Sequence, residues 1–216
     1  MRLIAPSILA ADKNKLKEEI RLAELSGADY LHVDIMDGKF VPETTWDLSF
    51  YQKIRSFNPL FHDVHIMVEK PWIVGPKFAK ARADNVTFHL DACHDEKQVW
   101  ETISLIKKEG AKASISIKPN TPIEDVFPYL DDVYLVLVMS VEPGLGGQKF
   151  IPSSLKKIEG LKKRKGDKEF PLIEVDGGIN EETGPACFAS GADILVSGSY
   201  LFGHPDFKKR LEGLKG

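Results

Sequence analysis

The sequence predicts a single α/β domain over residues 1–216, folded as a closed (βα)8 barrel of the TIM type. Short apolar runs typical of strands alternate with amphipathic helical patterns along the chain, which indicates parallel βαβ units. Eight such units can be placed, and eight strands close into a barrel. An open doubly wound sheet is the alternative. It normally carries a GxGxxG turn after its first strand, and this sequence has none there.

The predicted strands and helices follow one another in order. The strands cover residues 3–7, 30–34, 61–67, 85–89, 112–117, 133–139, 172–176 and 194–197. The helices cover residues 13–26, 47–57, 71–81, 95–108, 122–129, 152–164, 180–190 and 205–214. The helix at 95–108 is the clearest, because Val99, Ile103 and Ile106 recur at helical spacing and Gly110 follows as a stop signal.

Three turns between a helix and the next strand share one pattern. They read Gly27-Ala-Asp29, Arg82-Ala-Asp84 and Gly191-Ala-Asp193. The repeated turns support a chain built from βα units. In such a barrel the functional site forms at the carboxyl ends of the strands and in the loops that follow.

The composition argues against several classes of partner. The net charge is −3, with 29 basic and 32 acidic side chains, so no nucleic-acid surface is predicted. The lysine-rich run at 156–168 is interpreted as the solvated face of one helix. No apolar run is long enough to span a membrane, and residues 3–11 contain Pro6 and Ser7, which favours a first strand over a secretion signal. Two cysteines without a CxxC pair favour a reducing cytoplasm.

Three predicted strands carry residues that bind metals at or near their carboxyl ends. His32 and Asp34 share one face of the second strand, His65 lies on the third, and Asp176 ends the seventh. Two nitrogen and two oxygen ligands suit Zn²⁺, and nearly as well Fe²⁺, Mn²⁺ or Co²⁺. We therefore predict one divalent metal ion on these four residues.

The remaining histidines are given simpler interpretations. His89 ends the fourth strand, and a hydrogen-bonded structural role is preferred there to a role as a further ligand. His62, His94 and His204 are expected in loops or at the surface.

Glycine-rich turns follow the last three predicted strands, at 139–148, 176–178 and 197–199. Such turns let backbone N–H groups approach an anion, and barrels commonly bind phosphate after strands seven and eight. Met36, Met67 and Met139 lie at the ends of their strands. They fit an apolar lining that excludes water, although filling gaps in the core is the simpler alternative.

The chain closely resembles ribulose-phosphate 3-epimerases over essentially its whole length. The matching motifs are Ala5-Pro-Ser-Ile-Leu9, His32-Val-Asp-Ile-Met-Asp-Gly38, Phe40-Val-Pro42, Asp63-Val-His-Ile-Met-Val68, Met139-Ser-Val-Glu-Pro-Gly-Leu-Gly-Gly-Gln148, Glu174-Val-Asp-Gly-Gly178 and Val196-Ser-Gly-Ser199. The resemblance implies a (βα)8 barrel that interconverts D-ribulose 5-phosphate and D-xylulose 5-phosphate in the pentose phosphate pathway, and a homo-oligomer.

The resemblance also implies roles for single residues. Asp34 and Asp176 would be the acid/base pair that acts through an enediolate, and they would hold the metal together with His32 and His65. The remaining substrate contacts would come from Ser7, His65, Met36, Met67, Met139, Gly144, Gly146, Gly147, Gly177, Gly178, Gly198 and Ser199.

One segment departs from the family pattern, and two other functions stay open. Residues 43–49 are expected near the substrate, where they would bear on sugar specificity. A 3-epimerase of a six-carbon ketose phosphate, such as D-allulose 6-phosphate, is therefore one alternative. A non-catalytic phosphosugar-binding module is the other. The decarboxylase and hexulose-phosphate synthase chemistry needs an Asp-x-Lys-x-x-Asp strand, and Asp34-Ile-Met-Asp37 lacks the lysine.

Overall fold

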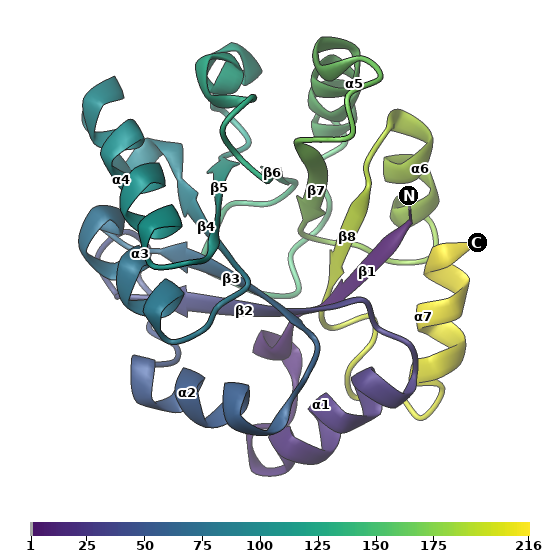
Figure 1. Cartoon of the computed structure of the whole chain (residues 1–216). Helices are drawn as coiled ribbons and strands as arrows, with labels where there is room; N and C mark the ends of the chain where they lie inside the picture. Colours follow the sequence, from purple (N-terminus) through teal and green to yellow (C-terminus); the bar gives the residue numbers. More distant parts are fainter. Residues whose placement is uncertain (1) are drawn as a thin grey trace.

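A computed structural model describes residues 2–216 as a ring of eight parallel strands surrounded by helices (Figure 1). The strands are β1 (Leu3–Pro6), β2 (Tyr30–Met36), β3 (Phe61–Met67), β4 (Asn85–His89), β5 (Lys112–Ile117), β6 (Leu135–Met139), β7 (Leu172–Asp176) and β8 (Ile194–Ser197). Each strand pairs with the next in the chain from β2 to β8, and β8 pairs with β1. The predicted barrel is confirmed.

The ring is completed between β1 and β2. Ser7 and His32 form a parallel bridge there, and the Asp29 N–H donates to the Ile4 carbonyl over 3.0 Å. The closure therefore brings the carboxyl end of β1, with Ser7, beside the candidate metal ligand His32.

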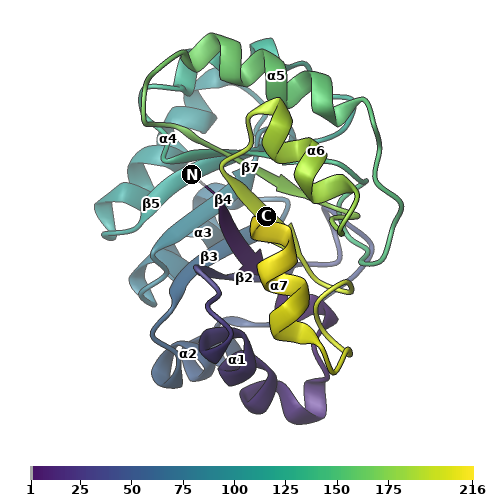
Figure 2. The same cartoon turned by 90° about the vertical axis from the view of Figure 1, so that its right-hand side faces the viewer.

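The helices lie outside the strands. They are α1 (Leu16–Leu25), α2 (Leu48–Phe57), α3 (Pro71–Lys80), α4 (Glu96–Lys108), α5 (Ser154–Lys165), α6 (Thr183–Ser190) and α7 (Phe207–Lys215). Figure 2 shows α7 beside β1. Among residues 2–216, no helix combines the length and the apolar character needed to cross a bilayer.

Two predicted helices differ in form. The segment predicted at 13–26 begins with a 3₁₀ turn, η2 (Lys13–Lys15), because the Asp12 side chain accepts the Asn14 N–H before α1 starts. The segment predicted at 122–129 is a 3₁₀ helix, η4 (Ile123–Tyr129), and contains Pro128. Proline has no N–H to donate, which disfavours a regular α-helical turn.

The three repeated turns have a common structural role. Each aspartate accepts a backbone N–H from the preceding strand: Asp29 from Ile4 (2.9 Å), Asp84 from His62 (2.8 Å) and Asp193 from Ile173 (2.9 Å). The side chains thus join neighbouring strands at the amino end of the barrel.

The lysine-rich run is less solvated than predicted. The Lys165 side chain is buried, and its ammonium group lies 3.1 Å from the Asp193 carboxylate and 2.8 Å from the Pro171 carbonyl oxygen. The interpretation of this run as a wholly solvated face is wrong at Lys165, because Asp193 and the turn before β7 offer acceptors that a charged side chain can use.

The barrel interior is divided into a polar and an apolar part. Outward side chains of the strands pack under the helices, as Leu31, Val33 and Ile35 of β2 do. Because side chains alternate along a strand, the residues between them face inward. The inward residues of β2 to β5 and of β7 are mostly polar, whereas those of β1, β6 and β8 form an apolar cluster that includes Ala5, Leu135, Leu137, Ile194 and Val196.

Candidate active site and metal centre

The four predicted metal ligands converge at the carboxyl ends of β2, β3 and β7. One donor atom each from His32, Asp34, His65 and Asp176 lies within 4.8 Å of the others. Asp34 Oδ1 is 3.3 Å from His32 Nε2 and 3.2 Å from His65 Nδ1. Parallel strands in register place these side chains together, because Asp34 pairs directly with His65 across β2 and β3.

The donor set fits a divalent metal ion. Two ligands bound tetrahedrally at 2.0–2.1 Å are separated by about 3.3 Å, which matches the spacing of Asp34 Oδ1 from each imidazole nitrogen. His32 Nε2 is buried and finds no hydrogen-bond partner within residues 2–216. An uncompensated imidazole nitrogen beside a carboxylate is the arrangement that a metal ion would satisfy.

His89, the histidine for which a structural role is predicted, lies against the candidate ligand His65. His89 Nε2 is 2.9 Å from His65 Nε2, and both side chains are fully buried. Burial, reinforced by the neighbouring His65, holds the pKa of His89 well below its usual range. The arrangement leaves His65 Nδ1 directed toward Asp34.

The two aspartates have pKa values displaced in opposite directions. Burial alone would raise the pKa of Asp34, but the adjacent His32 and His65 hold it well below its usual range. Burial, reinforced by the Asp34 carboxylate, raises the pKa of Asp176 to about 6. Near neutral pH the site therefore pairs a firmly ionised carboxylate with one that can exchange a proton.

A cavity of about 510 Å³ opens above these groups. Its lining includes most of the residues predicted to contact substrate, which are Ser7, Asp34, Met36, Met67, Met139, Gly144, Gly146, Gly147, Asp176, Gly177, Gly178, Gly198 and Ser199. His32 and His65 are fully buried and lie outside that lining. The cavity thus exposes the two aspartates and leaves the two imidazoles beneath them.

The loops after β6, β7 and β8 form the glycine-rich part of the cavity. Gly178 has φ of +65°, and a Cβ atom there would lie 2.5 Å from the Phe150 backbone nitrogen. Ser140 Oγ donates to the carbonyl oxygens of Asp176 and Gly177, at 2.8 and 2.7 Å, and so holds the loop after β7. Glycine lets this loop pack closely and expose its backbone to an anion.

The three methionines lie on the cavity wall, as their positions in the strands predicted. Met36 and Met67 pack in one cluster with Val41, and Leu9 and Phe40 pack against that cluster. The part of the wall formed by this cluster is therefore apolar and carries no side-chain proton donors.

Segment 43–49, which departs from the family pattern, packs against β2. Within the described chain, the cavity lining contains none of these residues. Thr45 hydrogen-bonds to the backbone of β2. Its hydroxyl donates to the Asp34 carbonyl oxygen over 2.6 Å and accepts the Met36 N–H over 2.9 Å. The chain folds back after Met36, where Asp37 pairs with Thr44, so Thr45 lies beside the strand that carries Asp34. The influence of this segment on sugar specificity stays a prediction.

His62 is also placed differently from its prediction. It is fully buried within β3, where Nε2 lies 3.2 Å from Asn58 Oδ1 and the ring meets the edge of Tyr51. The loop or surface prediction is wrong because His62 points outward from the barrel into the layer between strand and helix.

Comparison with known proteins gives the family. The model of the ribulose-phosphate 3 epimerase family matches residues 3–202. The chain is 45% identical over 216 residues to the ribulose-phosphate 3-epimerase of Bacillus subtilis (strain 168), covering 99% of this chain and 98% of that protein. The chain belongs to the ribulose-phosphate 3-epimerase family. Within the family it is also 42% identical over 213 residues to the ribulose-phosphate 3-epimerase of Methanocaldococcus jannaschii, covering 98% of this chain and 89% of the relative.

Membership of the ribulose-phosphate 3-epimerase family makes the chain an isomerase of the epimerase class, as the sequence predicted. Among solved structures, a 3-hexulose-6-phosphate synthase superposes with a TM-score of 0.66 and covers 99% of this chain and 97% of its own, at 16% identity. At that identity the likeness concerns the barrel fold alone.

Proposed function

We propose that this chain catalyses the metal-dependent 3-epimerisation of D-ribulose 5-phosphate to D-xylulose 5-phosphate. One observation carries the proposal: Asp34 and Asp176 face one cavity from different strands, with pKa values displaced in opposite directions. The family membership supports the substrate. A phosphorylated ketose also fits the glycine-rich loops on one side of the cavity.

The two aspartates account for inversion at C3. C3 lies next to the C2 ketone, so removing its proton gives an enediolate, and returning a proton on the opposite face inverts the centre. Asp34 and Asp176 face the cavity from different strands, so one carboxylate can remove the proton while the other, in its protonated form, returns one. In the reverse direction the two roles exchange.

The residues around the pair would position the substrate. Ser7 Oγ donates to Asp34 Oδ2 over 2.7 Å, which leaves Oδ1 turned toward the imidazoles. Backbone groups of the glycine-rich loops would bind the phosphate, and the methionine wall would exclude water from the carbanion face.

His32, Asp34, His65 and Asp176 are the residues that would hold the metal ion. When bound there, a divalent cation supplies positive charge that stabilises negative charge developing on the substrate oxygens. Zn²⁺ is the ion we favour, with Fe²⁺, Mn²⁺ and Co²⁺ as alternatives.

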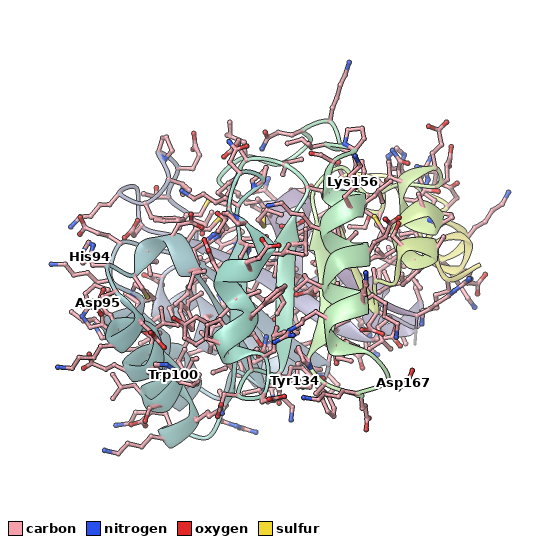
Figure 3. All side chains as sticks on the ribbon, turned by 90° about the horizontal axis from the view of Figure 1, so that it is seen from above. His94, Asp95, Trp100, Tyr134, Lys156 and Asp167 are labelled. Carbon is pink, nitrogen blue, oxygen red and sulfur yellow. The ribbon has the colours of Figure 1, made fainter. Side chains whose placement is uncertain are left out.

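The test is proton exchange at C3, followed by NMR in deuterated water. We expect the wild type to convert ribulose 5-phosphate to xylulose 5-phosphate with deuterium at C3, and Asp176→Asn to lose conversion by a factor of about 10² to 10⁴. Asp167→Asn is the matched control, because Asp167 is exposed and does not line the cavity. It follows α5 at the end remote from Lys156 (Figure 3). A wild type that leaves ribulose 5-phosphate unchanged in the presence of metal would contradict the proposal.

The same experiment addresses the alternatives. Residues 43–49 do not line the cavity, which favours the pentose phosphate. The six-carbon ketose phosphate stays an alternative, which the same exchange assay tests with that sugar as substrate. A non-catalytic binding module would bind the sugar phosphate without exchange at C3. The cytoplasmic location and the homo-oligomer stay predictions.

A further inference from the structure

A buried hydrogen-bonded network lies beneath the candidate metal centre, and its members other than His32 have no role in the chemistry described above. His32 Nδ1 is 2.6 Å from Asp63 Oδ2, and neither side chain has any exposed surface. Asp63 lies on β3 two residues before His65, so it faces the barrel interior on the same side as that ligand. A carboxylate this deep is costly unless it is fully hydrogen-bonded.

Asp63 is itself held by side chains from the next strands. Its Oδ1 accepts from Asn85 Nδ2 of β4 over 2.7 Å, and Asn85 Oδ1 accepts from Ser114 Oγ of β5 over 2.7 Å. Ser114 Oγ in turn accepts the Leu135 N–H of β6 over 3.1 Å. The network therefore runs across the barrel from β2 to β6 and gives Asp63 one fixed orientation.

We propose that Asp63 is a positioning residue for His32 in metal binding. By accepting the Nδ1 proton, its carboxylate fixes the imidazole tautomer that presents the Nε2 lone pair to the metal site, and it fixes the ring plane as well. Asn85 holds the carboxylate in that orientation. The inference rests on the metal dependence proposed above, and it assigns to Asp63 a role in metal affinity that does not involve touching the substrate.

A second cation between these groups is the alternative interpretation. Donor atoms of His32, Asp63 and Glu174 also lie within 4.8 Å of one another. Two ligands of one tetrahedral metal would stand about 3.3 Å apart, however, and the Nδ1–Oδ2 distance is 2.6 Å. That distance is typical of a direct hydrogen bond to a carboxylate, which favours the positioning role.

The test measures metal affinity directly. The full-length protein is stripped of metal and titrated with Zn²⁺ against a chelating dye, as wild type and as Asp63→Asn. We expect the variant to bind Zn²⁺ about 10- to 100-fold more weakly. Bound Co²⁺ serves as a second readout, because its visible absorption reports the ligand geometry, and we expect that spectrum to change.

Two further variants separate positioning from general destabilisation. Asn58→Ala removes a buried hydrogen bond to His62, the neighbour of Asp63 that points to the outer side of β3. It should lower the thermal stability without changing the Zn²⁺ affinity or the Co²⁺ spectrum. Asn85→Ala keeps both metal-site carboxylates and His32, and should weaken Zn²⁺ binding by a smaller factor. If Asp63→Asn does not fold, the Zn²⁺ affinity of Asn85→Ala tests the positioning role in its place.

The outcomes are distinguishable. The positioning role would be overturned if Asp63→Asn and Asn85→Ala both bound Zn²⁺ as tightly as the wild type. It would also be overturned if Asn58→Ala lost as much Zn²⁺ affinity as Asp63→Asn. Either result would leave the proposed epimerase activity intact. A wild type that binds no Zn²⁺ or Co²⁺ would overturn the metal dependence and the positioning role together.

Discussion

Replacing Asp176 by asparagine is expected to stabilise the metal-free protein near neutral pH, although the same substitution lowers its turnover. Burial, reinforced by the Asp34 carboxylate, raises the pKa of Asp176 from 3.8 to about 6 in the folded state. The unfolded chain releases this proton near the ordinary value. As the pH rises from there through the folded pKa, the folded state is therefore progressively destabilised relative to the unfolded state.

The size of the effect follows from that difference. About two pKa units correspond to a destabilisation of the folded state by about 3 kcal/mol. This destabilisation is complete at a pH above the pKa of Asp176 in the folded state, and it is absent at a pH below the pKa in the unfolded state. Asparagine carries no charge and avoids this cost. We therefore expect the free energy of unfolding of Asp176→Asn to be up to about 3 kcal/mol higher than that of the wild type near pH 8. This difference in stability should shrink as the pH falls toward about 4.

Urea unfolding after treatment with a chelator, repeated across this pH range, measures the gap. Asp167→Asn controls for the loss of one negative charge at an exposed position. An Asp176→Asn variant no more stable than wild type near neutral pH, or a gap that does not narrow in acid, would refute the reasoning. Adding Zn²⁺ should stabilise the wild type more than the variant, because the variant lacks one of the carboxylate ligands.

Three other predictions concern the cavity and its support. Gly178→Ala places a Cβ atom 2.5 Å from the Phe150 nitrogen at a φ of +65°. The substitution should therefore lower the stability by at least about 1–2 kcal/mol and raise the KM for the sugar phosphate. Equal KM values in wild type and variant would contradict the phosphate role of that loop. Thr45→Val removes the hydroxyl that bonds to both the Asp34 carbonyl oxygen and the Met36 N–H. The substitution should lower the stability measured by thermal unfolding by about 1–3 kcal/mol, and it should also lower kcat. Removal of metal should abolish turnover and Zn²⁺ should restore it; full activity in protein shown by elemental analysis to lack metal would rule out the metal dependence.

Much of the candidate site could be predicted from the sequence because the barrel obeys simple rules. Side chains alternate along a strand, and the carboxyl ends of parallel strands meet at one end, so the sequence alone assigns His32, Asp34, His65 and Asp176 to one place. The same alternation applies to Asp63, which lies two residues before His65 and faces the same way. Sequence reasoning does not single out Asp63, because a strand position far from the loop carries no sign of function by itself.

Other assignments depended on distances that no pattern contains. The sequence of residues 43–49 shows a departure from the family, but only the fold shows Thr45 supporting Asp34 from behind the strand. His62 and His65 are three residues apart on one strand, and the first is structural while the second lies at the metal site. Which face of a strand becomes the interior is decided by its register with both neighbours.

The sequence by itself determined the fold class, the end of the barrel that carries the site and the residue types gathered there, because local periodicity and chain order dictate these features. The tertiary structure alone decided what each group is able to do. The pKa of Asp176 near 6, the hydrogen bond that orients His32 and the fixed position of Asp63 each arise between residues from different strands. Electrostatic energies and hydrogen bonds depend on distances of a few ångströms and on exclusion of water, and only closure of the barrel sets these distances.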